Sequence, residues 1–356
     1  MTSLADDGSE GTLRHAVEAE GPRTVTFAVS GDIHLTAPLN IRNPYLSILG
    51  ETAPGAGITL RDHNVFVEAD HTVIRYMRFR LGSAAGAEAD ALGAKRCGNI
   101  IFDHCSISWA VDENASFYNI TDATIQWCII SEALNASVHH KGQHGYGGIW
   151  GGRNVSFHHN LFAHNNSRNP RFDHPRLYHG QELLTGRGTV EFVNNVVYNW
   201  GMKAIYGGEE GWFNVVENWF RPGPATRHLD GEWLDISTSS TTSMIPGSFY
   251  ISDNEYDVSA VKKGGLEGRK PDYKKIEEWD DRYEDASVGT PFAVKVDLDV
   301  QDAEDAYKAV LKHAGASKKR DAVDRRIIRE VRKGKALKTG SVTGLPGIID
   351  SEKDVL

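Results

Sequence analysis

Cysteine is scarce in this chain of 356 residues, which has only Cys97, Cys105 and Cys128. A small, odd number of cysteines excludes a disulfide framework as the basis of the fold. No stretch approaches the roughly eighteen consecutive apolar residues of a membrane span. The formal net charge is −9, so the chain also lacks the basic excess that binding to nucleic-acid phosphates needs. We therefore expect neither a membrane nor a nucleic-acid partner.

A secretion leader is also missing from the N-terminus, where Met1 is followed directly by a polar stretch. We interpret this stretch as mature sequence and expect a secreted or periplasmic protein whose leader is not part of the chain. Glycine, by contrast, is abundant, with 36 residues, and 40% of the residues are hydrophobic, which is enough to bury a core. An elongated β fold of this length can form a single unit.

Short β-rich runs recur through the middle of the chain, as they do in repeat proteins. When seven of these runs are aligned, one position holds asparagine in four of them and cysteine in two. That position is occupied in turn by Met77, Cys105, Cys128, Asn160, Asn195, Asn218 and Asn254. The shortest spacings match one coil of a solenoid, and the longer ones match a coil with an inserted loop. We predict an all-β fold, a right-handed parallel β-helix, because a sandwich would not need one polar residue at a fixed register.

The four asparagines predict a ladder in which side-chain amides bond from coil to coil, since stacked identical side chains stabilise β-stacks. Cys105 and Cys128 either continue this ladder as buried thiols, which are common in cores, or form a disulfide. At the N-terminus, residues 10–18 are typical of a short capping helix with Thr12 or Gly11 near its N-cap.

The chain changes character near residue 260. Residues 261–290 are charged and interrupted by Pro and Gly, whereas residues 302–334 have helical periodicity. Because solenoids need caps, we expect a β-helix domain, 1–260, that carries the candidate site. A partly helical C-terminal extension, 261–356, would pack on the β-helix without being an independent domain. Its basic segment 318–335 is a solvated face or, alternatively, a calmodulin-type target or nucleic-acid arm.

Carboxylates gather at both ends of the apolar run Ile100-Ile101-Phe102. They belong to Glu88, Asp90, Asp103, Asp112 and Glu113. A strand with carboxylates at both ends presents oxygen ligands from a rigid element, and hard cations such as calcium bind such ligands. Two loops, 131–153 and 164–180, interrupt the coil rhythm and are dense in Gly, His and Arg. Function concentrates in loops of this kind on a rigid scaffold.

Two motifs stand out in this region. The first is Asn99-Ile-Ile-Phe-Asp-His-Cys-Ser-Ile-Ser, which Glu88 and Asp90 precede and Asp112 follows. The second is Arg168-Asn-Pro-Arg-Phe. Together they resemble the pectate lyases of polysaccharide lyase family 1, over about residues 70–220 of this chain.

The resemblance implies a calcium site formed by Glu88, Asp90 and Asp112, with Asp103 as a structural anchor rather than a ligand. The family's next ligand falls on Ser116 here. This departure leaves the fourth ligand open between Ser116, Glu113 and water.

The resemblance also implies that Arg168 is the catalytic base. Arg171 and Lys141 would bind substrate. Where the family has a further arginine this chain has Asp173, and Arg176 is the expected replacement. A guanidinium is normally protonated, so Arg168 as base would need neighbouring cations. The alternative is that Arg168 only stabilises charge while hydroxide or a histidine takes the proton.

The implied function is that of a monomeric, calcium-dependent pectate lyase, which cleaves 1,4-linked α-galacturonan by β-elimination. Elimination removes the C5 proton next to a carboxylate, and a bridging calcium would neutralise the charge that develops there. Calcium would also explain how an acidic protein binds an acidic polysaccharide. Two alternatives are a β-helix polygalacturonase, which would need acid and base carboxylates flanking the bond, and a non-catalytic glycan-binding β-helix.

Histidines and tryptophans offer further alternatives. A zinc site could form from His139, His140, His144 and His174, although their spacing is not that of a tight zinc motif. A sugar cleft or simply the core could contain Trp109, Trp150 and Trp200.

Overall fold

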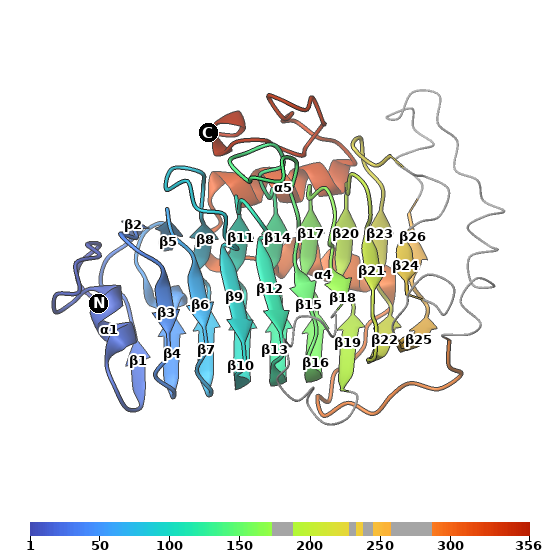
Figure 1. The fold of residues 1–356 in the computed structure, drawn as a ribbon, viewed down its shortest axis with the longest axis horizontal. Helices are drawn as coiled ribbons and strands as arrows, with labels where there is room; N and C mark the ends of the chain where they lie inside the picture. Colours follow the sequence, from blue (N-terminus) through green and yellow to red (C-terminus); the bar gives the residue numbers. More distant parts are fainter. Residues whose placement is uncertain (173–187, 228–232, 238–244, 258–286) are drawn as a thin grey trace.

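The structure, a computed structural model, describes residues 1–172, 188–227, 233–237, 245–257 and 287–356. Within these residues, strands form three long sheets that run along one axis (Figure 1). Each complete coil contributes one strand to each sheet in a fixed order, and strands pair in parallel with those of the next coil. The predicted parallel β-helix is confirmed.

The elements have the following bounds. Sheet A contains β1 (Arg23–Val25), β4 (Leu46–Leu49), β7 (Thr72–Arg75), β10 (Gly98–Asp103), β13 (Thr121–Gln126), β16 (Arg153–His158), β19 (Thr189–Val193), β22 (Trp212–Val216) and β25 (Ser248–Ser252). Sheet B contains β2 (Gly31–His34), β5 (Ile58–Arg61), β8 (Arg78–Arg80), β11 (Ser106–Ser108), β14 (Ile129–Ser131), β17 (Leu161–Ala163), β20 (Val196–Tyr198), β23 (Trp219–Arg221) and β26 (Glu255–Tyr256). Sheet C contains β3 (Leu39–Ile41), β6 (Val65–Val67), β9 (Leu92–Lys95), β12 (Ala115–Tyr118), β15 (Ile149–Trp150), β18 (Arg171–Phe172), β21 (Ile205–Gly207) and β24 (Leu234–Ile236). The described helices are α1 (Leu13–Glu18), η1 (Gly50–Thr52), α4 (Ala303–His313), η4 (Ser317–Lys319), α5 (Ala322–Lys333) and η5 (Glu352–Asp354).

The asparagine ladder lies at the corner between sheets A and B. Asn160 donates from Nδ2 to Asn195 Oδ1 at 3.0 Å, and Asn195 donates in the same way to Asn218 at 3.1 Å. Asn218 continues the ladder to Asn254 at 2.8 Å, and the backbone N–H of Cys128 donates to Asn160 Oδ1 at 2.9 Å. The predicted ladder is therefore present, and the disulfide alternative is wrong because both Cys105 and Cys128 are free thiols.

The residue before each ladder position turns the chain sharply. His104, Trp127 and His159 have φ values of 55°, 52° and 57°, in the left-handed region that most residues avoid. Their rings stack on one another from coil to coil, with centroids 5.9 and 4.2 Å apart. Each β-rich run of the sequence is thus two strands from two sheets joined by a corner, rather than one strand.

Aromatic rings fill much of the interior of the solenoid. Phe117 packs on Phe102 with centroids 5.0 Å apart, and Trp150 packs on Phe157 at 4.6 Å. Trp109, Trp150 and Trp200 are each at most 1% exposed. All three therefore belong to the core, and the alternative that they line a sugar cleft is wrong.

Helix α1 closes the N-terminal end, where Figure 1 draws it in blue. Its Leu13 and Val17 join the main hydrophobic core. The Thr12 side chain caps the helix by accepting a hydrogen bond from the His15 backbone N–H. The predicted capping helix and its N-cap are confirmed.

Helices α4 and α5 cover the outer face of sheet B (Figure 1). Their apolar residues pack on Ile129, Leu161, Ala163, Val196 and Tyr198. Ion pairs reinforce this contact: Arg80 Nη2 lies 2.8 Å from Asp324 Oδ1. The described helices α4 and α5 of the extension pack on the β-helix, and α5 in segment 318–335 is a packing element rather than a free basic arm. The division at residue 260 stays a prediction. Among the described residues, none of the helices has the length and apolar character to cross a bilayer.

Asn195→Ala should destabilise the protein more than substitution of a peripheral asparagine. Asn195 is fully buried and accepts from the Asn160 backbone N–H, so its loss leaves buried polar groups unpaired. Each such group costs about 1–3 kcal/mol. Calorimetric melting of Asn195→Ala should show a clear drop in Tm. The control Asn43→Ala, which removes two exposed hydrogen bonds to the Glu18 and Ala19 carbonyls, should show little. Equal losses in the two variants would argue against the ladder.

Asp103 should stabilise the fold at neutral pH and lose this effect in acid. Burial opposes its ionisation, but hydrogen bonds from His104, Arg75 and Gln126 outweigh burial and lower its pKa to about 2. The unfolded chain has the ordinary value of about 3.9. The stabilisation is therefore present above about pH 4 and lost as the pH falls towards 2. The Tm difference between wild type and Asp103→Asn should shrink over this range. A difference that does not change with pH would contradict the assignment of Asp103 as an anchor.

Candidate active site

The candidate residues lie in one row of turns that connect sheet B to sheet C. In four successive coils this turn spans residues 81–91, 109–114, 132–148 and 164–170. Neighbouring strands in a parallel sheet are about 4.8 Å apart, so residues far apart in sequence meet when they occupy the same turn. The row brings together Glu88, Asp90, Asp112, Glu113, His139, His140, His144, Tyr146 and Arg168.

Three carboxylates converge at the centre of the row. Asp90, Asp112 and Glu113 each offer an oxygen atom, and these atoms lie within 4.8 Å of one another. Burial and the charge of Asp112 raise the pKa of Asp90 to about 7. Such repulsion between like charges is relieved by a cation, and oxygen donors are the ligands that calcium prefers. The donor set therefore fits a hard divalent cation.

Glu88 and Ser116 do not belong to this group of three carboxylates. Glu88 lies apart from this group of three and is bonded to the side chain and the backbone of His140. Ser116 is buried in β12, where its hydroxyl bonds to Asp90 and accepts from the Ile149 backbone N–H at 3.3 Å.

Arg168 lies in the turn 164–170 and faces the three carboxylates, which lie in the turns 81–91 and 109–114. Its guanidinium forms an ion pair with Glu113 and lies over the Tyr146 ring, 4.5 Å from the ring centroid. Its Nε donates to Tyr206 Oη at 3.2 Å. The backbone N–H of Gly148 donates to the Arg168 carbonyl at 2.8 Å. A Cβ at Gly148 would lie 1.7 Å from the Ala115 carbonyl oxygen, so only glycine fits there.

The other substrate-binding residues of the prediction divide into three cases. Arg171 is half-buried in β18, where its Nη2 pairs with Glu209 at 3.3 Å. Lys141 is exposed in the 132–148 loop beside His139 and His140. Arg176 lies outside the described residues.

The sequence did not single out two tyrosines and a lysine of this region. Tyr146 packs between His144 and Arg168, with its centroid 4.1 Å from that of His144. Tyr206 has Arg171 and Lys203 near its ring, at 5.5 and 5.2 Å. Tyr146 reaches the site because it lies in the inserted loop 132–148. Tyr206 reaches it because β21 pairs in register with β18, which carries Arg171. Neither motif spacing nor composition could have indicated them.

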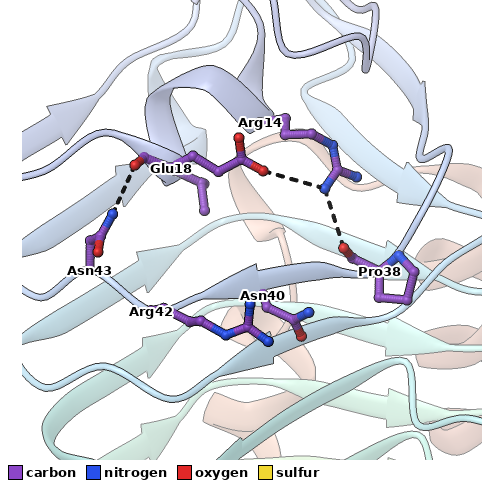
Figure 2. A pocket seen from close by; sticks show the side chains of 7 residues that line it. Arg14, Glu18, Pro38, Asn40, Arg42 and Asn43 are labelled. Atoms are coloured by element: carbon purple, nitrogen blue, oxygen red, sulfur yellow. Dashed lines mark hydrogen bonds and ion pairs between the residues drawn. The ribbon is translucent and has the colours of Figure 1, made fainter.

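The described residues also form a pocket at the first coils, beside α1. Its lining includes Arg14, Glu18, Asn40 and Arg42 (Figure 2). Arg14 is already engaged by Asp6, at 2.7 Å, and by the Pro38 carbonyl. The pocket belongs to coils that contribute nothing to the row of turns, so it is distinct from the candidate site.

Sequence comparison finds curated relatives over almost the whole chain. A probable pectate lyase C of Aspergillus flavus is 34% identical, with 93% of this chain and 72% of the relative covered. A probable pectate lyase C of Neosartorya fischeri is 32% identical, with coverage of 98% and 77%. The chain belongs to the pectate lyase family. A scan against models of protein families found no match.

Solved structures agree with this fold. A pectate lyase from Bacillus sp. N165 in complex with trigalacturonate has a TM-score of 0.56 at 15% identity, covering 83% of this chain and 86% of that one. The cedar pollen allergen jun a 1 has a TM-score of 0.58 at 16% identity, covering 88% and 87%. At such identities the likeness concerns the fold alone. The family that the two motifs indicated is confirmed by the curated relatives, which match over almost the whole chain.

Proposed function

We propose that this pectate lyase cleaves 1,4-linked α-galacturonan by calcium-assisted β-elimination, with Arg168 as the base. The observation that carries the proposal is the ion pair between Arg168 and Glu113, which joins a guanidinium to the group of three carboxylates. A group of carboxylates that could hold a cation thus lies beside the candidate base. Glu88, Asp90 and Asp112 would hold calcium. Of these, Asp90 and Asp112 belong with Glu113 to the group of three, whereas Glu88 lies apart from it on His140, and Ser116 bonds to Asp90.

The chemistry follows from the substrate. Removal of the C5 proton leaves negative charge next to the C6 carboxylate. The C4–O bond then breaks as a C4=C5 double bond forms, and the departing oxygen takes a proton from water. Bound calcium supplies a Lewis acid that neutralises the substrate carboxylate. Arg171 would orient a carboxylate through its planar fork of N–H donors, and Lys141 and Arg176 remain candidates for the same task.

Arg168 must change state before it can accept a proton. Glu113 binds the guanidinium in its ordinary, protonated form. Arg168 would have to leave Glu113 and release a proton to solvent before it takes the C5 proton. Its contacts with Tyr146 and Tyr206 would hold it towards the substrate during this change. An acidic polysaccharide is the expected partner. A secreted monomer remains the prediction for the protein as a whole.

Incubation with polygalacturonate should produce an unsaturated uronide, which is measured by its ultraviolet absorbance. A chelator should abolish the signal and added calcium should restore it, because the three carboxylates then lack their counter-charge. New reducing ends without absorbance would instead indicate a hydrolase. Binding of the polymer without either signal would indicate a non-catalytic β-helix.

Arg168→Ala should lower kcat on polygalacturonate by about 10²- to 10⁴-fold, the usual effect of removing a group that transfers a proton. A cooperative melting transition should show that the variant still folds, with a lower Tm because buried Glu113 loses its ion-pair partner. Arg96→Ala, which alters an exposed arginine beyond the end of β9, serves as the matched control and should keep full activity. Turnover of Arg168→Ala at the wild-type rate would refute the role of Arg168 while leaving the lyase reaction itself open to the absorbance assay.

A further inference from the structure

The 132–148 loop places three imidazoles against the proposed calcium carboxylates. His140 Nδ1 lies 2.5 Å from Glu88 Oε2, and the His140 backbone N–H donates to Glu88 Oε1 at 2.7 Å. His144 Nε2 lies 2.6 Å from Asp112 Oδ1. His139 Nε2 is 3.9 Å from both Glu88 and Asp112. The loop therefore contacts acids that belong to two other coils.

Packing fixes the orientation of these rings. His139 stacks on His144 with centroids 4.0 Å apart, and His144 packs on Tyr146, which in turn lies under Arg168. The His139 and His144 side chains are only 3% and 9% exposed. The stack joins Asp112 to Arg168 through neighbouring side chains of one loop.

The C-terminal segment anchors the start of this loop. The Asn135 backbone N–H donates to the Ile349 carbonyl at 2.8 Å, and the Ala136 backbone N–H donates to Asp350 Oδ1 at 3.0 Å. Arg326 of α5 pairs with Glu132 at 2.8 Å. The loop is therefore held at its base as well as at its tip.

These imidazoles are better suited to donate hydrogen bonds than to ligate a transition metal. The Lys141 backbone N–H donates to His139 Nδ1 at 3.1 Å. A neutral imidazole has one donor and one acceptor nitrogen, so His139 carries its proton on Nε2, the atom that faces the acids. A metal ligand would need Nε2 free of its proton. An ionised carboxylate only accepts hydrogen bonds, so His140 Nδ1 and His144 Nε2 also carry protons where they contact Glu88 and Asp112. These contacts favour N–H groups that point at carboxylates over a zinc site.

We propose that His140 and His144 are positioning residues, which hold the Glu88 and Asp112 carboxylates in the orientation that binds calcium. A carboxylate has about four lone-pair sites, so Asp112, which accepts the His144 N–H, and Glu88, which accepts two N–H groups of His140, can both still bind a cation. Partners of this kind orient metal ligands and typically account for about 10- to 100-fold in metal affinity. The inference rests on the proposed function, since it presupposes a calcium site at these carboxylates.

Calcium titration calorimetry on chelator-stripped protein tests the inference without any turnover. His144→Phe keeps a ring for the stack but removes the N–H donor, and it should weaken calcium binding about tenfold or more. His144→Gln retains an N–H donor and should restore part of the affinity. Melting curves recorded in chelator should show that both variants remain folded.

A matched control is available elsewhere in the chain. His34 Nδ1 lies 2.6 Å from Asp62 Oδ2, a histidine–carboxylate contact like that of His144, but on the first two coils. His34→Phe should leave calcium affinity unchanged. His140→Phe should weaken calcium binding less than His144→Phe, because the His140 backbone N–H still holds Glu88.

The outcomes separate the inference from the proposed function. If wild type binds calcium and His144→Phe binds it equally well, the positioning role is overturned and the calcium site stands. If wild type binds no calcium, both are overturned. Cobalt titration of the stripped wild type offers a second readout. Strong visible bands of tetrahedral Co²⁺, lost in His144→Phe, would make the imidazoles metal ligands and overturn the positioning role.

Discussion

Parallel register between coils is the constraint on which the rest of this structure depends. The asparagine ladder fixes it at one corner, because each amide bonds both to the next asparagine and to a strand carbonyl of the preceding coil. In the coils before Asn160 the same corner holds buried Met77, Cys105 and Cys128, and parallel pairing in the three sheets keeps the register there. The row of turns between sheets B and C therefore brings Asp90, Asp112 and Arg168 together although they are distant in sequence.

The outer faces of sheets B and C differ in what covers them. Sheet B is covered by α4 and α5, and its buried arginines Arg78 and Arg80 are compensated by aspartates of the α5 N-terminus. Sheet C instead presents half-buried Arg171, Tyr206 and Asp235 in one register row. The carboxylates beside this row repel one another without a cation, and perturbed acids of this kind cluster at functional sites. The helices packed on sheet B make that side rigid, and this rigidity holds the like-charged carboxylates together beside sheet C.

Much of this arrangement could be predicted because it follows a period. Asparagine at one register in four coils predicted the ladder, and the motif around Asp103 indicated carboxylates of which Asp90 and Asp112 lie together in the structure. The Arg168 motif indicated a guanidinium at the site, and Arg168 lies in the turn 164–170, two coils after the turn of Asp112. Contacts that no period governs could not be predicted. The loop 132–148 has no repeat, so its sequence does not show that His144 contacts Asp112 or that Tyr146 lies under Arg168.

The sequence by itself determined the parallel β-helix, the capping helix, the family and the identity of the acids and of Arg168, because spacing and motif are local properties of the chain. Only the tertiary structure decided which groups pair. In the structure Glu113 pairs with Arg168, Glu88 bonds to His140, and Trp109, Trp150 and Trp200 lie in the core. The physical reason is that pairing depends on distances across coils and on the path of inserted loops. Those are set by packing of the whole solenoid and its C-terminal helices, rather than by any one stretch of sequence.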